Sequence, residues 1–221
     1  MQFNETILKR KSTRAFLNKP VEAEKIQQIL DLARHAPSGV NTQPWQVAVV
    51  SGATKKQLEQ KMEQAFRSGV KANMDYQYYP KQWKEPFKSR RKACGLKMYS
   101  TLNISRDDKQ RQLDQWAANY RAFDAPVVLF FFLDESAETG SFLDYGMFLQ
   151  SVMLAAVDQG LATCPQAALT EYPEIVKTKL NQDENSLLIC GMALGYEDCD
   201  ALINSYRLDR EEYSSFTQFF D

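Results

Sequence analysis

The stretch APVVLFFFL, residues 125–133, is followed closely by SFLDYGMFLQSVMLAAVDQGLA, residues 141–162, and these two stretches set the architecture. Residues 127–133, bounded by Pro126 and Asp134, are apolar at every position, which is typical of a central strand buried on both faces. The second half of 141–162 is apolar nearly all round, so a helix there must be covered on every side. The sequence therefore predicts a buried sheet with helices packed on it.

Other segments complete this pattern. Residues 22–36 carry apolar residues at i, i+3, i+4 and i+7, which predicts an amphipathic helix that stops at Pro37-Ser38-Gly39. Residues 45–52 read as a short buried strand, a helix is expected from about Thr54, and residues 186–196 read as a strand with glycines. The irregular alternation of helices with few strands favours an α+β fold, and no linker divides residues 1–221, so a single domain is expected.

Composition excludes several classes of protein. The 221 residues have a formal net charge of −1, so no overall field would hold the chain on nucleic acid or on an acidic membrane. The N-terminus lacks an apolar signal core and the longest apolar run is too short to cross a bilayer, so a cytoplasmic protein is expected. The four cysteines show no CxxC spacing and His35 is the single histidine, so we expect reduced core thiols and no metal site.

The end of the chain indicates an assembly. The tail 204–221 carries five aromatic residues among charges, too many to leave in water, although the tail is too short to fold alone. Together with the all-apolar helix near 152–157, this predicts a symmetric homodimer. The alternative is that both features complete the core of a monomer.

RKSTRAFLNKP, residues 10–20, places three positive charges, Arg10, Lys11 and Arg14, around two hydroxyls. An arginine fork matches phosphate oxygens and a Ser12 hydroxyl can fill a remaining oxygen, so donors at alternate positions of an extended segment would cradle a monophosphate. The alternative is a solvated basic patch at the end of a first helix, where cations favour the helix dipole.

APSGVNTQPWQ, residues 36–46, lies between a predicted helix and a predicted strand. Its proline, glycine and amide side chains permit close backbone approach and offer both donors and acceptors, a combination suited to the polar edge of a planar heterocycle. The alternative is an ordinary turn.

Together the two stretches resemble the N-terminal signature of the FMN-dependent nitroreductases, Arg-x-Ser-x-Arg/Lys-x-Phe followed after a helix by Ala-Pro-Ser-x-x-Asn-x-Gln-Pro-Trp. The matching positions are Arg10, Ser12, Arg14, Phe16, Ala36, Pro37, Ser38, Asn41, Gln43, Pro44 and Trp45. The resemblance continues through residues 144–169, 187–196 and 204–210, and so covers most of the chain. It implies a mainly antiparallel central sheet covered by helices in an intertwined homodimer, with two sites at the subunit interface.

The resemblance also implies roles for individual residues. Arg10, Ser12 and Arg207 would hold the FMN phosphate, and Lys11 would be a further cofactor-binding residue. Arg14 would lie near the flavin pyrimidine, where positive charge favours the reduced cofactor. Arg210 follows the same tail pattern but could equally form a structural ion pair. The loop residues would reach the flavin bound mainly by the other subunit; they are Pro37, Ser38, Gly39, Asn41 and Gln43.

In the family, backbone N–H groups near CPQAAL, residues 164–169, point at flavin N5 and O4, which implies Ala167 and Ala168 here, with Pro165 and Gln166 beside them and no side-chain acid. Some related dehalogenases have a threonine-rich segment at this place, so the departure favours two-electron hydride chemistry. A nucleophilic Cys164 is disfavoured because no base is adjacent in sequence.

Residues 73–99 interleave aromatic residues with cations, a pattern that also occurs in single-strand nucleic-acid binding, but the neutral chain disfavours that function. The segment resembles a lid insertion of a nitrobenzoate-reducing branch of the family, at about 73–122, and would stack a flat substrate. The alternative is that each aromatic only packs the lid onto the body. Lys71 and Asn73 are candidates for the flavin N3 edge.

The resemblance thus implies an NAD(P)H oxidoreductase in which NADH or NADPH delivers hydride through flavin N5 and a nitroaromatic or quinone follows in the same space, with ping-pong kinetics. No GxGxxG fingerprint is present, which fits transient stacking of the nicotinamide. The alternatives are another flavin enzyme on the same scaffold, such as a reductive dehalogenase or enone reductase, and a non-enzymatic flavin-binding module.

Overall fold

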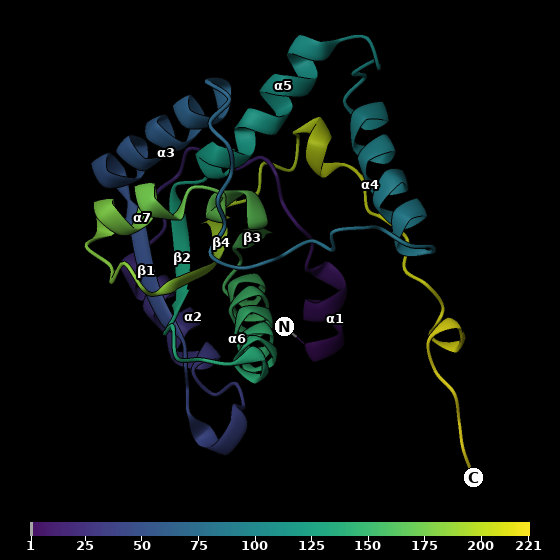
Figure 1. Ribbon diagram of the computed structural model, residues 1–221. Helices are drawn as coiled ribbons and strands as arrows, with labels where there is room; N and C mark the ends of the chain where they lie inside the picture. Colours follow the sequence, from purple (N-terminus) through teal and green to yellow (C-terminus); the bar gives the residue numbers. More distant parts are fainter. Residues whose placement is uncertain (1) are drawn as a thin grey trace.

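The computed structural model describes residues 2–221, which form a four-stranded sheet with helices on both faces (Figure 1). The strands are β1 (Gln46–Ser51), β2 (Val127–Leu133), β3 (Ala162–Gln166) and β4 (Leu187–Gly195), in the order β1-β2-β4-β3. Every neighbouring pair is antiparallel. The prediction of a mainly antiparallel sheet in an α+β fold is therefore confirmed.

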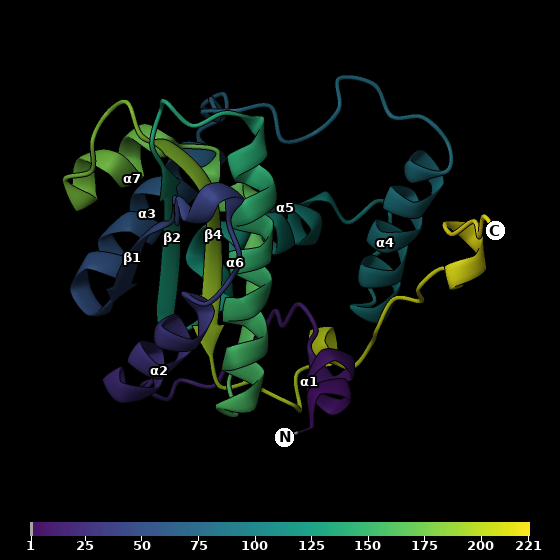
Figure 2. The same cartoon turned by 90° about the horizontal axis from the view of Figure 1, so that it is seen from below.

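Strand β2 lies at the centre of the fold, and both of its faces are buried. Val127, Leu129, Phe131 and Leu133 face the layer of α2 (Ala23–Ala33) and α6 (Thr139–Asp158). The intervening Val128, Phe130 and Phe132 face α3 (Gly52–Arg67), α7 (Pro173–Leu180) and the short helix η2 (Ala118–Asp124). The strand shows no polar alternation because each face has its own core. Figure 2 shows α2 and α6 on one side of the strands and α3 on the other.

Helix α6 has 20 residues and is apolar enough, by length and composition alone, to cross a membrane. Its apolar character is explained by the core: Tyr145, Phe148 and Val152 are at most 2% exposed against the sheet. The buried Tyr145 hydroxyl donates to the Phe132 carbonyl oxygen at 2.9 Å, which fixes the helix on β2. Leu143, by contrast, is 71% exposed, so one stripe of α6 is uncovered in the single subunit.

Two expectations need correction. The helix expected over 141–162 ends at Asp158, because Gly160 adopts a left-handed φ of +74°. The following residues 162–166 form β3, an edge strand that the sequence did not predict. The four cysteines are free, but the expectation that all are core thiols is wrong: Cys199 is exposed and Cys94 is half-buried.

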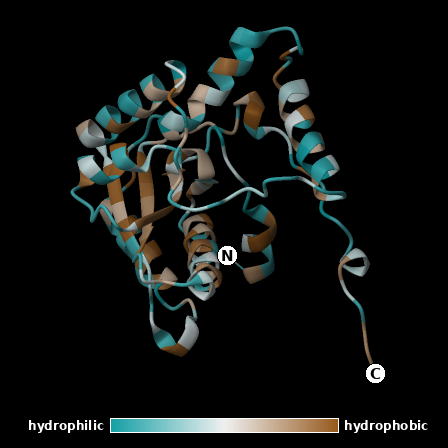
Figure 3. Cartoon of the chain, viewed as in Figure 1, coloured by the Kyte–Doolittle hydropathy of each residue, from teal (hydrophilic) through white to brown (hydrophobic). Residues whose placement is uncertain are grey.

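The remaining helices lie at the periphery. They are α1 (Phe3–Lys9), η1 (Gly39–Asn41), α4 (Phe87–Thr101), α5 (Lys109–Ala117), η3 (Ala167–Thr170), η4 (Leu202–Asn204) and η5 (Tyr213–Ser215). Helix α4 contains no buried residue and stands away from the sheet with the C-terminal tail beside it (Figure 1). In Figure 3 the strands and α6 are largely brown, as expected for the core, whereas α4 is mostly hydrophilic.

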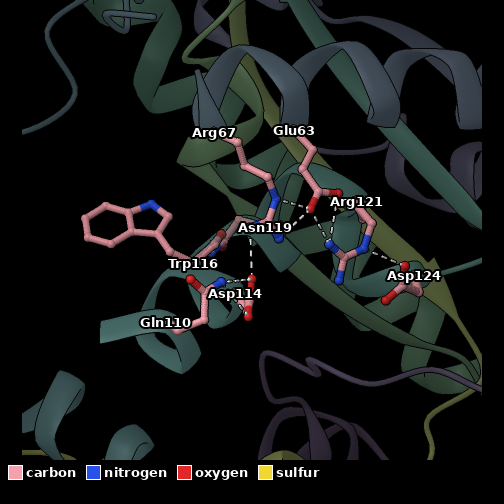
Figure 4. Close-up of polar contacts among 8 residues, drawn as sticks. All are labelled: Glu63, Arg67, Gln110, Asp114, Trp116, Asn119, Arg121 and Asp124. Carbon is pink, nitrogen blue, oxygen red and sulfur yellow. Dashed lines mark hydrogen bonds and ion pairs between the residues drawn. The ribbon is translucent and has the colours of Figure 1, made fainter. Parts of the chain in front are cut away.

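A polar cluster fastens α5 and η2 to α3 (Figure 4). Arg67 bonds to Asp114 at 2.9 Å, and Arg121 bonds to both carboxylate oxygens of Glu63 at 2.9 Å and to Asp124 at 3.0 Å. Burial alone would raise the pKa of Glu63, but hydrogen bonds from Arg121 and Arg67 outweigh it and lower the pKa. The C-terminal end of residues 73–122 is therefore anchored on the body.

Candidate functional site

The segment after α1 runs along the open edge of the sheet. Ser12 forms a parallel bridge with Thr163, the Thr13 N–H donates to the Thr163 carbonyl oxygen at 3.0 Å, and Phe16 bridges to Glu197. The segment is thus extended, as a cradle of alternate donors requires. This pairing brings residues 10–14 beside β3, which ends with Pro165 and Gln166 and is followed directly by Ala167 and Ala168.

Asn204, which the sequence analysis did not single out, connects this segment to the tail. Its Oδ1 accepts from the Arg14 N–H at 2.8 Å, and its Nδ2 donates to the carbonyl oxygens of Ala15 and Asp198, both at 2.9 Å. Its own carbonyl oxygen accepts from Lys11 Nζ at 2.6 Å. A buried amide that satisfies three backbone groups fixes both ends of the chain relative to each other.

Asn204→Ala is expected to lower stability by about 2–3 kcal/mol, because it leaves the part-buried Arg14 N–H without its acceptor and removes the side-chain donor to the carbonyl oxygens of Ala15 and Asp198. FMN affinity is expected to fall as well, since residues 10–14 lose their register with the tail. Thermal melts and flavin titration of the variant measure both effects. Asn185→Ala, at an exposed position, is the control and should change neither; equal effects in the two variants would contradict the role of Asn204.

A cavity of about 350 Å³ lies where the two ends of the chain meet. Its walls come from α1, the segment 10–14, α6 and the tail. The lining residues are Ile7, Leu8, Arg10, Lys11, Ser12, Arg14, Gln150, Tyr206, Arg207, Leu208 and Arg210. The structure thus brings together the predicted basic residues of both ends.

Three guanidinium groups of this cavity have no carboxylate partner in the part of the chain that the structure describes. In residues 2–221 no carboxylate lies within ion-pairing distance of Arg10, Arg207 or Arg210. Burial, together with the charges of Arg210 and Arg207, lowers the pKa of Arg10. Arg207 donates to the Lys9 carbonyl oxygen at 2.5 Å and to that of Leu8, which fixes its position at the end of α1. Three cations that line one cavity and have no carboxylate partner among residues 2–221 form a candidate anion site.

Lys11 behaves differently from the arginines. Its ammonium is 2.6 Å from a carboxylate oxygen of Glu197, in addition to its bond to the Asn204 carbonyl. It lines the cavity, but its charge is compensated inside the protein. Sequence alone could not distinguish it from Arg10, because Glu197 lies far along the chain.

A second cavity, of about 480 Å³ and mostly apolar, lies on the other side of the α6 stripe. Its lining residues are Tyr76, Tyr78, Phe142, Tyr145, Gly146, Leu149, Met153, Pro165, Gln166, Ala167, Ile189 and Cys190. Gly146, Leu149 and Met153 of α6 line this cavity, and Gln150 on the same face of the helix lines the first. The two cavities are therefore neighbours along one face of α6.

The predicted segment 164–169, which is the end of β3 and the start of η3, lines this second cavity only in part. Pro165, Gln166 and Ala167 line it, whereas Ala168 packs against the core on the α3 side. Gln166 Nε2 donates to the Asn119 carbonyl oxygen at 3.0 Å, which fixes this strand end against η2. Burial raises the pKa of Cys164 to about 11, so this thiol stays protonated at neutral pH and does not act as a nucleophile.

The predicted loop 36–43 does not join the arginine-lined cavity. It projects from the body between α2 and β1 (Figure 1), held by the Gly39 N–H, which donates to Asp144 Oδ2 at 3.1 Å, and by the Gln43 N–H, which donates to Ser38 Oγ at 3.0 Å. Val40 is 98% exposed with φ +44°, a strained value for a β-branched residue. Strain on a projecting loop is typical of a binding element.

Pro37 contacts a further apolar cavity of about 430 Å³ on α6, lined also by Phe142, Leu143, Gly146, Met147 and Gln150. Gln43 and Asn41 also have positive φ, and both are exposed. Pro37 and Gly39 are therefore held next to α6, Asn41 and Gln43 are exposed on the projecting part of the loop, and none of these residues lines the arginine-lined cavity.

Tyr76 anchors the aromatic segment beside the second cavity. Its hydroxyl donates to the Ile189 carbonyl oxygen at 2.6 Å and its ring lies 5.1 Å from that of Phe142, and burial raises its pKa. The preceding Asp75 pairs with the buried Lys177 at 3.0 Å. Residues 73–76 are thus fixed, and the Asn73 backbone N–H donates to the Glu171 carbonyl oxygen at 2.9 Å.

The fold and the site define an α+β protein with an arginine-lined anion cavity beside an apolar, aromatic one. The sequence profile of the nitroreductase family matches residues 7–196, and the chain belongs to this family.

Individual relatives match over nearly the whole length. The chain is 35% identical to the 4-nitrobenzoate reductase of Pseudomonas putida, over 98% of this chain and 95% of the relative. It matches the crystal structure of the FMN- and NADPH-dependent nitroreductase NfnB from Sphigopyxis sp. strain HMH with a TM-score of 0.97 at 34% identity, covering 100% of each chain. For the FMN-dependent NfnB from Mycobacterium smegmatis in complex with NADPH, the TM-score is 0.94 at 33% identity, covering 99% of this chain and 97% of the other.

Proposed function

We propose that this protein is an FMN-dependent NAD(P)H oxidoreductase that reduces nitroaromatic compounds and quinones. The observation that carries the proposal is the meeting of Arg10, Arg207 and Arg210 beside an apolar cavity, with no carboxylate partner for any of them among residues 2–221. A flavin mononucleotide has the matching chemistry, since a phosphate is joined to a flat ring system. Relatives that are 33–35% identical are named as nitroreductases or nitrobenzoate reductases.

The residues fit this cofactor. Arg10, Arg207 and Arg210, with the Ser12 hydroxyl, would hold its phosphate, and Lys11, paired with Glu197, would fix the position of the segment that carries Arg10 and Ser12. Arg14 would lie near the ring, and the backbone of Ala167 would face its reactive edge. When bound, FMN would supply hydride transfer between a reduced nicotinamide and the oxidant.

The second cavity would take the nicotinamide and the oxidant in turn. Its walls are apolar and aromatic, so they suit flat rings and would keep water away from the site of hydride transfer. Residues 73–122 would form its lid within the single domain 1–221, fixed at one end by Asp75 and Lys177 and at the other by Arg121 and Glu63.

We also propose a homodimer with two flavin sites at the subunit interface. The uncovered stripe of α6, the projecting loop 37–43 and the tail 200–221 support it, since Phe219 and Phe220 are 82% and 86% exposed in the single subunit. The tail would wrap the partner, and Pro37, Ser38, Gly39, Asn41 and Gln43 would reach the partner's flavin. We propose a cytoplasmic location, consistent with four free cysteines.

An absorbance spectrum of the purified protein tests the function. Yellow colour should bleach when NADPH or NADH is added under argon, and should return when a nitroarene is added. A flavin that neither nicotinamide reduces would contradict the oxidoreductase, and a reduced flavin that transfers only to a halogenated or enone substrate would point to another enzyme on this scaffold.

A further inference from the structure

The segment that leads to and forms α4 is strongly basic. Residues 77–101 carry seven Lys or Arg side chains and one carboxylate, in a chain whose formal net charge is −1. That carboxylate, Glu85, accepts from the Ser89 N–H at 3.2 Å, and so serves the start of the helix. The proposed function, as stated, uses none of this charge.

Most of these cations have no ion-pair partner among residues 2–221. Within the part of the chain that the structure describes, the only ion pair of this segment joins Arg90 to Glu211 of the tail at 3.0 Å. Lys88, Arg91 and Lys92 stand at i, i+3 and i+4, so they share one exposed side of α4. All three lie in the first two turns, where the helix dipole opposes positive charge. The repulsion among these three charges and with the helix dipole destabilises the free helix, and a bound anion would offset it.

A row of aromatic rings connects this basic face to the second cavity. Tyr78 lines the cavity, and its ring centroid is 4.7 Å from that of Tyr79, which is 5.9 Å from that of Trp83. The Arg91 guanidinium carbon then lies 5.3 Å from the Trp83 centroid. In Figure 1 this segment crosses in front of the molecule from the sheet to α4.

The length of this row selects the ligand. The carboxylate of a benzoate is one bond from its ring. A benzoate bound in the cavity beside Tyr78 is therefore too short to reach Arg91, which lies beyond Tyr79 and Trp83. A dinucleotide whose nicotinamide occupies the cavity carries its adenosine phosphates much further out, and its adenine can stack on an aromatic ring. The charge that distinguishes NADPH from NADH is the 2′-phosphate of that adenosine.

We propose that Lys88, Arg91 and Lys92, with Trp83, bind the 2′-phosphoadenosine end of NADPH and make the protein prefer NADPH over NADH. The proposal rests on the proposed function, because it assumes that the nicotinamide enters the second cavity. The contact is between exposed charges, so it weakens with ionic strength.

The test compares Arg91→Gln/Lys92→Gln with Lys56→Gln/Lys61→Gln, which removes the same charge from exposed positions of α3. With FMN-loaded protein, the KM for NADPH should rise about tenfold in the α4 variant, as expected for two partly screened contacts, while the KM for NADH changes less than twofold. Calorimetry should show the same loss for adenosine 2′,5′-bisphosphate and no change for AMP. Arg91→Lys should retain most of the NADPH preference, and the α3 variant should match the wild type.

The outcomes separate the two proposals. If neither nicotinamide reduces the wild-type flavin, the proposed function fails. If the wild type is reduced but the α4 variant keeps the wild-type ratio of NADPH to NADH, the assignment of α4 is wrong. Equal rises in both KM values would place the pyrophosphate there instead, and a selective rise in KM for nitrobenzoate over nitrobenzene would place the substrate carboxylate there; either result overturns the proposal.

Discussion

Arg10→Ala combined with Arg207→Ala should give a protein that purifies without colour. Each guanidinium is expected to contribute about 1.5–3 kcal/mol through hydrogen bonds to a charged phosphate, so the double variant should lose about 10²- to 10⁴-fold in FMN affinity. Neither residue has a carboxylate partner in residues 2–221, so the change leaves no acidic group unpaired. Flavin content after purification and titration of the apoprotein with FMN measure the loss.

The control separates cofactor binding from folding. Arg207 also donates to the carbonyl oxygens at the end of α1, so its removal affects local structure. Among the described residues, the Arg210 side chain donates only to the carbonyl oxygens of its neighbours Leu208 and Asp209. Arg210→Gln should therefore weaken FMN binding with little effect on local structure. Arg34→Ala/Lys61→Ala removes the same charge elsewhere. Full flavin content in the Arg10/Arg207 variant would place the phosphate in another cavity.

Gly191→Ala should destabilise the protein by about 3 kcal/mol, which corresponds to roughly 6–12 °C in Tm for a chain of this size. A Cβ at position 191 would lie 2.4 Å from Leu169 Cβ and 2.5 Å from Leu169 Cδ1. The Cδ1 atom can move by rotation of the side chain, but the Cβ atom is fixed to the backbone of η3. The substitution therefore has to push η3 away from β4.

Because η3 begins at Ala167, the same change should disturb the wall of the second cavity, and the steady-state rate should fall together with Tm. Gly95→Ala in α4 is the matched control: a Cβ there meets nothing within 4 Å, and alanine favours a helix, so stability should be unchanged or slightly increased. A Gly191→Ala protein that melts like the wild type would show that η3 moves freely against β4.

Local patterns predicted the elements that carry an apolar repeat. Residues 127–133 form β2 as expected, the expected helix near Thr54 is α3 with Leu58 and Met62 buried, and the strand expected over 186–196 is β4. Strand β3 has five residues and includes Pro165, so it shows no such repeat. It exists because β4 offers it a partner, and that is information about distant residues.

Only some residues of the candidate site could be predicted from the sequence. The resemblance pointed to Arg10, Ser12 and Arg207, which the structure places in one cavity. Asn204 was missed because an asparagine near the end of a chain carries no pattern, and its importance comes from partners about 190 residues away.

The amino-acid sequence by itself predicted the buried strands β2 and β4, the helices α2 and α3, and basic groups near both ends of the chain. Periodicity and composition suffice for this, because they report on each residue's immediate environment. Only the tertiary structure decided that Arg10, Arg207 and Arg210 meet while Lys11 is neutralised by Glu197, and that the basic side of α4 is reached by aromatic rings from the apolar cavity. Those relations depend on which strands pair and how closely β4 approaches η3, so they arise only when segments far apart in the chain come into contact.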